Sequence, residues 1–388
     1  MRFKILTLNN ISVAGLQHLP REYYEVASEI QHPDAILLRS HNLHDFQIPP
    51  SLRAVARAGV GVNNVPVESL TERGIPVFNA PGANANAVKE LVVAGMLLAA
   101  RNICPAWAYV RSLTGDSEEL ERAVEQGKKQ FVGYELPRRV LGVVGLGAIG
   151  VEVANVALNL GMRVIGYDPG MTVERAWQLS SSVEQANSLD DLLLRSDMVS
   201  LHVPLNQHTR KLIDSERLAL LRKGSVLLNF SRASIVDEDD LLEALNQGLL
   251  SSYVCDFPSP LLKDHPQVVA LPHLGASTME AEDNCAVMVI ENMREYLESG
   301  NIRHSVNFPD SVMPKAGSCR LTVANRNVPN MLGQISTCLA KGGLNILDML
   351  NQSRGEVAYT VVDLDQKVPD ETYQEIASIE GVLAARVI

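Results

Sequence analysis

Cysteine, aromatic side chains and positive charge are all scarce in this chain of 388 residues, of which 5% are aromatic. The five cysteines show neither the paired spacing of metal ligands nor a dense disulfide framework, so we expect reduced thiols and no metal site. With 34 basic against 45 acidic side chains, the formal net charge is −11, and no basic block is interleaved with aromatics. This balance argues against nucleic acid as a partner.

Long apolar runs are also missing. The run at residues 5–8 is too short for a signal peptide, and the run at 91–100 falls well short of a membrane span. We therefore expect a cytoplasmic protein that has no membrane partner. The length and an apolar content of 46% predict two or three globular domains.

The first third of the chain alternates short apolar runs with turn and helix signals. Residues 35–38, 52–56 and 75–79 indicate buried strands, and residues 66–73 indicate a short helix. Such alternation is typical of a parallel sheet covered by helices. A long buried helix is expected next, over residues 86–101, whereas the polar segment 111–137 is expected to be irregular.

A second strand–helix series begins at Arg138. It predicts six strands, at 140–144, 163–167, 198–201, 225–229, 252–255 and 268–271, which describe one doubly wound Rossmann-type domain. A helix over residues 277–298 and a linker over 309–317 follow. The remaining residues predict a strand, helix, strand, strand, helix and strand, the ferredoxin-like βαββαβ order.

A dinucleotide-binding pattern, G-x-G-x-x-G, stands between a predicted strand and a predicted helix and reads Gly145-Leu146-Gly147-Ala148-Ile149-Gly150. The first glycine permits a tight turn, the second lets the backbone approach a pyrophosphate, and the third allows close packing of helix on strand. The helix N-terminus attracts the phosphates. Asp168 follows the next strand, where its carboxylate favours the ribose of NAD over the phosphorylated ribose of NADP. The alternative is a tight turn that binds nothing.

Two loops that follow predicted strands each carry a positively charged or titratable group. They read Asn229-Phe230-Ser231-Arg232 and Pro272-His273-Leu274-Gly275-Ala276. Open α/β sheets bind ligands at these carboxyl ends of their strands. Arg232 offers a planar fork to carboxylate and carbonyl oxygens, and His273 exchanges protons near neutral pH, which together suit hydride transfer at a 2-oxo acid. Taken singly, each side chain is more often structural, Arg232 in a loop salt bridge and His273 as a packed imidazole, and it is their joint placement that favours the catalytic interpretation.

These motifs resemble those of the D-2-hydroxyacid dehydrogenases over nearly the whole chain, including the run Arg57-Ala58-Gly59-Val60-Gly61-Val62-Asn63-Asn64. The tail from about Ser318 resembles an ACT domain, a small regulatory fold that often binds amino acids. The resemblance implies a flavodoxin-like substrate domain made of residues 1–90 and 286–310. It further implies an NAD-binding Rossmann domain at 91–285 and an ACT domain at 318–388.

By this resemblance, Arg232 binds the 2-oxo acid, His273 is the general acid and base, and Asp256 contacts the nicotinamide carboxamide. The cofactor is also expected to meet loop residues Asn229, Phe230, Ser231, Arg232, His273, Gly275 and Ala276. Backbone amides for the substrate carboxylate come from Gly59, Val60 and Gly61. Candidates for the substrate phosphate are Arg39, Arg57 and Lys128, with solvated surface charge an equal alternative for the first and last. A homodimer or homotetramer is expected.

The sequence departs from the family pattern in two places. The family usually places a Glu that pairs with the catalytic His a few residues beyond Asp256, and here this run is shorter and has no Glu. We therefore expect the pH–rate limb of His273 to lie lower than in relatives that retain the pair. In the tail, Asn325 stands in place of a usual His. Asn327 and Asn345 remain candidates for an amino-acid effector, with ligand-free assembly an equal alternative.

The resemblance implies an NAD-dependent, reversible oxidation of 3-phosphoglycerate to 3-phosphohydroxypyruvate. An unphosphorylated 2-oxo acid, such as glyoxylate or hydroxypyruvate, is a second candidate substrate. A non-catalytic NAD-sensing protein is a third interpretation, to which the missing Glu lends weight and against which the presence of both Arg232 and His273 argues.

Overall fold

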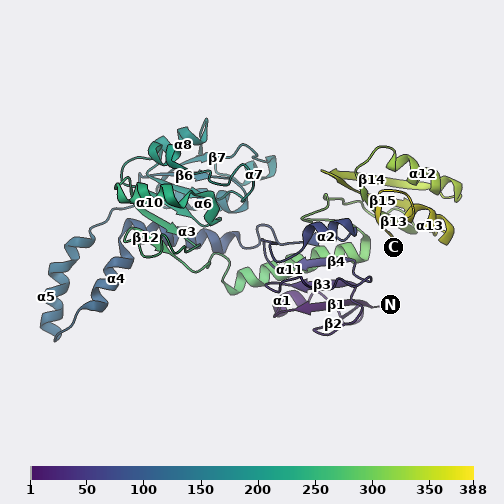
Figure 1. Cartoon of the computed structure of the whole chain (residues 1–388), viewed down its shortest axis with the longest axis horizontal. Coiled ribbons are helices and arrows are strands. Elements are labelled where there is room, and N and C mark those ends of the chain that lie inside the picture. Colours follow the sequence, from purple (N-terminus) through teal and green to yellow (C-terminus); the bar gives the residue numbers. More distant parts are fainter. Residues whose placement is uncertain (1) are drawn as a thin grey trace. The chain divides into compact units, whose positions relative to one another are not determined.

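The computed structural model describes residues 2–388, which divide into two compact units (Figure 1). Unit 1 joins the N-terminal residues up to Asn84 with Met279–Ile388, and unit 2 is Ala85–Thr278. The expected boundaries at 90/91 and 285/286 each fall inside a helix, namely α3 (Ala85–Ala100) and α11 (Met279–Ser299). The observed boundaries leave both helices whole, as expected for elements whose hydrogen bonds run along their length.

Unit 2 is built on a parallel sheet of seven strands in the order β12-β11-β10-β9-β6-β7-β8. The six predicted strands are confirmed. The seventh, β8, was missed because it has two residues, both polar and exposed. The strands are β6 (Val140–Val144), β7 (Arg163–Tyr167), β8 (Glu184–Gln185), β9 (Met198–Leu201), β10 (Ser225–Asn229), β11 (Leu250–Cys255) and β12 (Val268–Ala270).

Helices cover both faces of this sheet. On one face, α3 and α6 (Ala148–Asn159) pack against alternate residues of the strands, such as Val226 and Leu228. On the other face, residues such as Leu227 meet α8 (Leu189–Arg195), α9 (Ser215–Leu220) and α10 (Glu238–Asn246). The shorter elements are α7 (Val173–Gln178) and the 3₁₀ turn η2 (Ala233–Ile235). The strand order reverses at β6, the point where doubly wound sheets bind nucleotides.

A helical arm leaves unit 2 between α3 and β6 (Figure 1). It contains α4 (Ile103–Ser112), α5 (Ser117–Gly127) and the 3₁₀ turn η1 (Lys128–Phe131). The expectation of irregular structure over 111–137 is therefore wrong. Asp116 begins α5 with a reciprocal capping box to Glu119, which stabilises its first turn, and the buried Gly127 near its end lies against Tyr109 of α4. No single helix within residues 2–388 is long and apolar enough to cross a membrane, although α3 and α4 pass that test together across a 64° bend.

The N-terminal part of unit 1 is a five-stranded parallel sheet in the order β2-β1-β3-β4-β5, the flavodoxin-like order. Its strands are β1 (Phe3–Leu8), β2 (Tyr24–Ala27), β3 (Ala35–Leu38), β4 (Ala54–Arg57) and β5 (Val77–Phe78). Helix α11 packs on one face beside α1 (Val13–Leu16), and α2 (Val67–Glu72) packs on the other.

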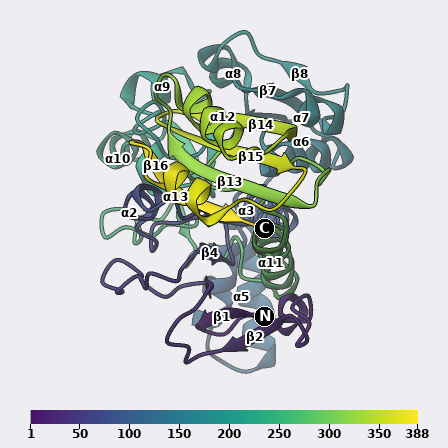
Figure 2. The ribbon, with the colours of Figure 1, turned by 90° about the vertical axis from the view of Figure 1, so that its right-hand side faces the viewer.

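The C-terminal part of unit 1 has the predicted βαββαβ order and forms an antiparallel sheet, β14-β15-β13-β16 (Figure 2). The strands are β13 (Cys319–Arg326), β14 (Ile346–Arg354), β15 (Val357–Leu364) and β16 (Val382–Val387). One face of the sheet is covered by α12 (Met331–Lys341) and α13 (Asp370–Ala377).

The opposite face of this sheet belongs to the core of the N-terminal part. Tyr359 and Val361 of β15 lie in one apolar cluster with Met293 and Phe308. Residues 309–317, which were expected to be a linker, are partly packed within unit 1. Ser311 is buried and forms an antiparallel β-bridge with Ile302. The C-terminal domain is thus seated on the rest of unit 1.

The docking also satisfies the carbonyl groups at the C-terminal end of α11. Arg386 donates to the Tyr296 and Leu297 oxygens at 3.3 and 2.9 Å. Arg320 donates to the Ser299 oxygen at 3.0 Å, and the Tyr359 hydroxyl donates to the Gly300 oxygen at 2.8 Å. Because the last carbonyls of a helix have no partner within it, these side chains from the C-terminal domain complete α11.

The buried side chain of Arg320 is the centre of this contact. Its guanidinium pairs with both oxygens of the equally buried Asp363, at 2.6 and 2.8 Å, and reaches the Asn301 side-chain oxygen at 3.1 Å. Burial raises the pKa of Asp363, but hydrogen bonds from Arg320 and the Ala316 amide outweigh it and hold that pKa below its ordinary value. The stabilisation is therefore present at neutral pH and is lost as pH falls through this lowered pKa.

We predict that Arg320→Met lowers the free energy of unfolding by about 3–5 kcal/mol, because it strands the buried Asp363 carboxylate. The matched control is Arg303→Met, which removes a half-exposed ion pair with Glu295 and is expected to cost less than about 1 kcal/mol. Scanning calorimetry measures both, since the two tryptophans, Trp107 and Trp177, lie in unit 2 and report poorly on unit 1. Equal losses in the two variants would contradict the assignment.

Candidate active site

Three glycines shape the loop between β6 and α6. Gly145 has φ +89°, and a Cβ there would lie 2.6 Å from the carbonyl oxygen of His202. A Cβ at Gly150 would lie 1.9 Å from the Gly145 oxygen, so only glycine lets the helix approach the strand. At Gly147 a Cβ would have no neighbour within 4 Å, which leaves open space above the loop.

The N-terminus of α6 opens into this space without a side-chain cap. Gly147 is its N-cap residue and has no side chain to accept the first amides, which include those of Ala148 and Ile149. Five other helices of unit 2 are capped by an acidic or hydroxyl side chain: Asp116, Thr172, Ser188, Asp214 and Asp237. Uncapped amides and the helix dipole suit an anion, so the loop fits the pyrophosphate of a dinucleotide.

Asp168, which follows β7, lies beside the glycine loop of residues 145–150. One of its carboxylate oxygens accepts the Leu146 amide and the other accepts the Gly170 amide, both at 2.8 Å. These bonds fix a half-buried carboxylate next to the glycine loop, and each oxygen retains acceptor capacity. A negative charge held there suits ribose hydroxyls and repels a ribose phosphate.

The loop after β10 is held by side chains that we had expected to contact the cofactor. Asn229 is fully buried and donates to the Arg232 carbonyl at 2.9 Å and to the Tyr253 hydroxyl at 3.2 Å, while its oxygen accepts the Ser231 amide. The Ser231 hydroxyl donates to the Leu201 oxygen at 2.6 Å. Both side chains are thus engaged in shaping the loop, and the sequence analysis missed Tyr253.

Phe230 is likewise a packing residue. It is buried in the core cluster that contains Val254, and a Cβ added to Gly95 of α3 would lie 2.9 Å from its ring. Only Arg232, the last residue of the motif, is exposed. The loop therefore uses three side chains as a scaffold and presents the fourth.

Asp256 organises the loop that carries His273. Its carbonyl accepts the His273 amide at 3.1 Å, and its carboxylate accepts the Leu274 and Gly275 amides at 2.6 and 2.8 Å. Asp256 is 1% exposed. His273 itself has φ +56°, a left-handed conformation that side chains other than glycine rarely adopt and that is found preferentially at functional sites.

The carboxylate of Asp256 is therefore occupied by backbone amides. This arrangement supports a role for Asp256 in holding the loop that carries His273. Within residues 2–388, the imidazole of His273 makes no hydrogen bond or ion pair with a side chain, and its one ring contact is Phe257.

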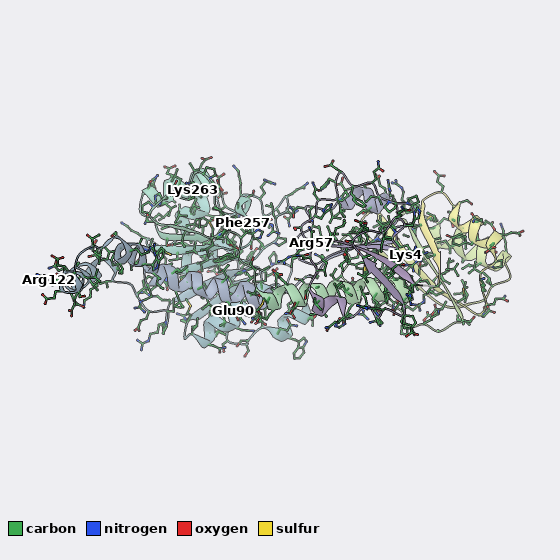
Figure 3. All side chains as sticks on the ribbon, turned by 90° about the horizontal axis from the view of Figure 1, so that it is seen from below. Lys4, Arg57, Glu90, Arg122, Phe257 and Lys263 are labelled. Carbon is green, nitrogen blue, oxygen red and sulfur yellow. The ribbon has the colours of Figure 1, made fainter. Side chains whose placement is uncertain are left out.

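Phe257, which the sequence analysis did not single out, contacts both candidate catalytic groups. Its ring centroid lies 4.9 Å from that of the His273 imidazole at an interplanar angle of 52°. The guanidinium carbon of Arg232 lies 5.8 Å from the same ring. Figure 3 labels Phe257 on unit 2. Arg232 and His273, which stand 41 positions apart, thus converge on one aromatic side chain.

Unit 1 assembles the residues expected to meet the substrate's acidic groups. Arg57 donates to the Arg39 carbonyl at 3.0 Å, and a Cβ at Gly59 would lie 2.1 Å from the Arg57 guanidinium. Gly59 therefore makes room for that side chain over its loop, which continues through Val60 and Gly61. The Arg39 guanidinium forms an ion pair with Glu282 at 2.6 Å, which offsets its charge.

Lys128 belongs to unit 2. It lies in η1 on the arm of unit 2, where it pairs with Glu125. The described part of the chain holds no group of three or more His, Cys, Asp or Glu side chains suited to a metal ion. All five cysteines are unpaired, and burial raises the pKa of the Cys255 thiol.

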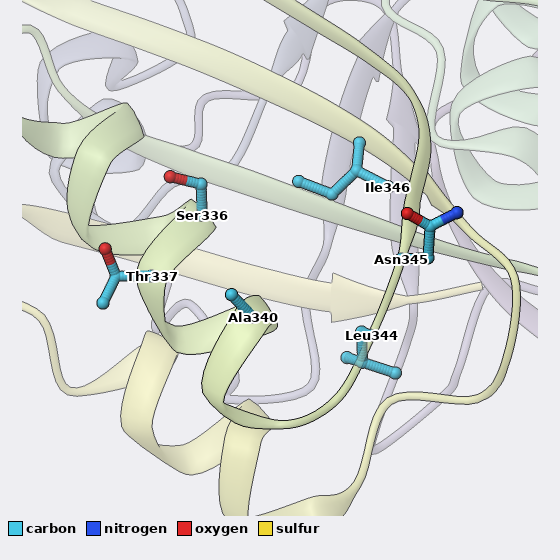
Figure 4. Close-up of a pocket in the computed structure, with 6 residues that line it drawn as sticks. All are labelled: Ser336, Thr337, Ala340, Leu344, Asn345 and Ile346. Atoms are coloured by element: carbon cyan, nitrogen blue, oxygen red, sulfur yellow. The ribbon is translucent and has the colours of Figure 1, made fainter.

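The two candidate effector residues lie at opposite ends of the C-terminal sheet. Asn327 follows Arg326, the last residue of β13, which pairs with Val357 at the start of β15. Asn345 precedes Ile346, the first residue of β14, which pairs with Leu364 at the end of β15. This register separates them by roughly 25 Å along the strands. Asn345 contributes to a shallow hollow between α12 and β14 (Figure 4), lined by Ser336, Thr337, Ala340, Leu344, Asn345 and Ile346. Within one chain they do not form a common site.

Comparison with known proteins places this geometry in a family. Residues 93–275 match the model of the D-isomer specific 2-hydroxyacid dehydrogenase NAD binding domain. A D-3-phosphoglycerate dehydrogenase of Methanocaldococcus jannaschii is 35% identical over 349 residues, 88% of this chain and 63% of that protein. The chain thus spans less than two thirds of this archaeal relative. The D-3-phosphoglycerate dehydrogenase of Haemophilus influenzae is 34% identical over 88% of this chain and 83% of its own length.

Solved structures agree with the architecture. The apo form of D-mandelate dehydrogenase from Rhodotorula graminis superposes with a TM-score of 0.67 at 26% identity, covering 81% of this chain and all of that one. A glyoxylate reductase from Paecilomyes thermophila gives 0.64 at 26% identity, covering 79% and 98%. Since the relatives match over most of both sequences and the nucleotide loop has the required open geometry, the chain belongs to the D-isomer specific 2-hydroxyacid dehydrogenases and carries their NAD-binding domain.

Proposed function

We propose that this enzyme oxidises 3-phospho-D-glycerate to 3-phosphohydroxypyruvate with NAD, reversibly, as the first step of phosphorylated serine biosynthesis. The observation that carries the proposal is the convergence of Arg232 and His273 on Phe257 within an NAD-binding domain. The substrate assignment follows the curated relatives, which are D-3-phosphoglycerate dehydrogenases matched over most of this chain.

The glycine loop and the uncapped N-terminus of α6 would hold NAD, whose nicotinamide would supply the acceptor for the hydride on C2 of the substrate. Arg232 binds the substrate carboxylate through its planar fork and stabilises negative charge on the C2 oxygen. His273 accepts the hydroxyl proton as the C2–O bond becomes a carbonyl, and returns it in the reverse direction. The exposed positions of both side chains leave them accessible to a small substrate.

Arg57 is the side chain we assign to the substrate phosphate, with Arg39 beside it. A guanidinium group can donate two hydrogen bonds to a phosphate at once. In the adjoining loop the Gly59 amide donates to the Arg57 carbonyl at 2.8 Å, so the amides of Val60 and Gly61 are the ones we assign to a substrate oxygen. The pairing of Arg39 with Glu282 favours a second candidate, a reductase for an unphosphorylated 2-oxo acid, because it leaves less positive charge for a phosphate.

We predict that His273→Asn lowers kcat by about 10²–10⁴-fold in both directions, since the proton loses its acceptor. Arg232→Lys keeps the charge but loses the planar fork, and is expected to reduce kcat/KM by about 10²-fold or more. NADH absorbance with 3-phosphohydroxypyruvate measures both. The control is His208→Asn, an exposed histidine of the same unit. An NAD-sensing protein would show no turnover in the wild type, and retained activity in His273→Asn would remove His273 from the reaction.

The phosphate assignment is tested by the ratio of kcat/KM for 3-phosphohydroxypyruvate to that for hydroxypyruvate. We expect Arg57→Gln to reduce this ratio by about 10–100-fold, because a charge-assisted pair of hydrogen bonds is lost. Arg53→Gln serves as control, since Arg53 lies in the same unit and pairs with Asp34. A wild-type ratio near one would favour the unphosphorylated substrate.

We infer that the C-terminal domain is an ACT domain. Its βαββαβ order and antiparallel sheet support this, and the hollow beside Asn345 suits a small polar ligand such as an amino acid. Since Asn327 lies at the other end of the sheet, an effector that contacts both residues requires a second copy of the domain. Assembly through this domain without a ligand is the alternative.

We further propose a homo-oligomer in which the arm of unit 2 packs against a second copy of the chain. Helix α4 has no buried residue, and Ile103, Trp107 and Val110 leave 43, 63 and 50% of their surface exposed. The spacing of three to four residues places them on one face of the helix. The far end of the arm includes Arg122 of α5, which is labelled in Figure 3. An apolar face of this kind on a projecting arm is typical of an interface between subunits.

We predict that Trp107→Glu converts the oligomer into a smaller species, because it places a charge in the apolar face. Light scattering coupled to size-exclusion chromatography measures the mass. Trp177→Glu is the matched control, since that tryptophan is 86% exposed on α7 and lies outside the arm. A mass unchanged by Trp107→Glu, or changed equally by both substitutions, would contradict the interface.

A further inference from the structure

We propose that Phe257 is a positioning residue that orients both Arg232 and His273, in place of a carboxylate paired with the imidazole. This inference rests on the proposed function, since it assigns a role within the same reaction. Its basis is the ring contact with His273 at 4.9 Å and with Arg232 at 5.8 Å. No other side chain of residues 2–388 contacts both groups in this way.

The backbone under Phe257 is firmly held. The preceding residue, Asp256, is buried, accepts three amides of the His273 loop and donates its own amide to the Asn229 oxygen. The Cys255 thiol donates to the Phe257 carbonyl at 3.6 Å. The residue that follows is Pro258, which restricts Phe257 to an extended backbone. The ring therefore projects from a fixed point.

The far end of this loop is anchored as well. Leu262 is 4% exposed in the core of unit 2, and its amide donates to the Ser259 oxygen at 3.3 Å. Pro260 stiffens the segment between them. A short loop anchored at Asp256 and Leu262 gives the ring little freedom to leave its two neighbours.

The chemistry of the ring suits this position. An aromatic face attracts a guanidinium or an imidazolium, and the contact with His273 limits rotation of the imidazole about its side-chain bonds. The ring neither accepts nor donates a proton, so it orients His273 without entering the proton transfer. Two charged groups of unit 2 face this site, the amide-bound carboxylate of Asp256 under the His273 loop and the Arg232 guanidinium across the Phe257 ring.

The test compares Phe257→Leu and Phe257→Met, which remove the aromatic face, with Phe257→Tyr, which keeps it. Leu261→Ala is the control, since this 43% exposed residue lies in the same loop. In NADH-dependent reduction of 3-phosphohydroxypyruvate, we expect the Leu and Met variants to lose about tenfold or more in kcat and to raise KM for the substrate. Phe257→Tyr and Leu261→Ala should stay within about twofold of the wild type. Binding of NADH, followed by fluorescence, should be unchanged throughout.

Two readouts separate orientation from general stability. Without the aromatic face, the imidazolium form loses an attraction, so the pH at which the reduction rate falls to half is expected to move down by about half a unit. In histidine-labelled protein, the ring-current shift of the His273 resonance, assigned with His273→Asn, should disappear in the Leu and Met variants and persist in Phe257→Tyr.

The proposal is overturned if the Leu and Met variants match Leu261→Ala in kcat, KM and pH profile, or if the His273 resonance does not respond to loss of the ring. Wild-type protein that binds NADH and shows no turnover with phosphorylated or unphosphorylated substrate would instead overturn the proposed function and, with it, this role. A ring-current shift in such a protein would leave Phe257 as a packing residue only.

Discussion

The buried carboxylate of Asp256 holds the loop that carries His273 in place. The carboxylate accepts hydrogen bonds from the Leu274 and Gly275 amides, and the backbone carbonyl of Asp256 accepts one from the His273 amide. A left-handed histidine is costly on its own, and these bonds explain how the loop retains it. The next residue, Phe257, then reaches both His273 and Arg232. Asp256 and Phe257, at the end of β11, thus join the loops that follow β10 and β12.

A second constraint acts in unit 1, where α11 depends on the C-terminal domain for its last hydrogen bonds. Side chains of Arg386, Arg320 and Tyr359 satisfy the carbonyls that the helix leaves unpaired. Because α11 begins directly after the His273 loop, the C-terminal domain is attached to a helix that starts next to that loop in the sequence.

Much of this architecture could be predicted from sequence, because apolar strands and the glycine pattern are determined by residues that are close together in the sequence. The six main strands of unit 2 and the βαββαβ tail are confirmed. Helix α5 was missed because most of its residues are polar and exposed, although it carries a short apolar stripe, Leu120, Ala123 and Val124, and a capping box at its start. The roles of Asn229 and Phe230 in shaping their loop, and the contacts of Phe257, depend on packing between segments distant in sequence, which no local pattern encodes. The separation of Asn327 from Asn345 likewise required the strand register.

The most direct test of the account is a crystal structure of the enzyme with NAD and 3-phosphoglycerate. The account predicts that Arg232 and His273 both lie within about 3.2 Å of oxygens on C1 and C2 of the same substrate molecule, with Phe257 still in contact with each of them. A substrate whose C2 hydroxyl meets neither side chain, or meets a group other than His273 as its proton acceptor, would contradict it.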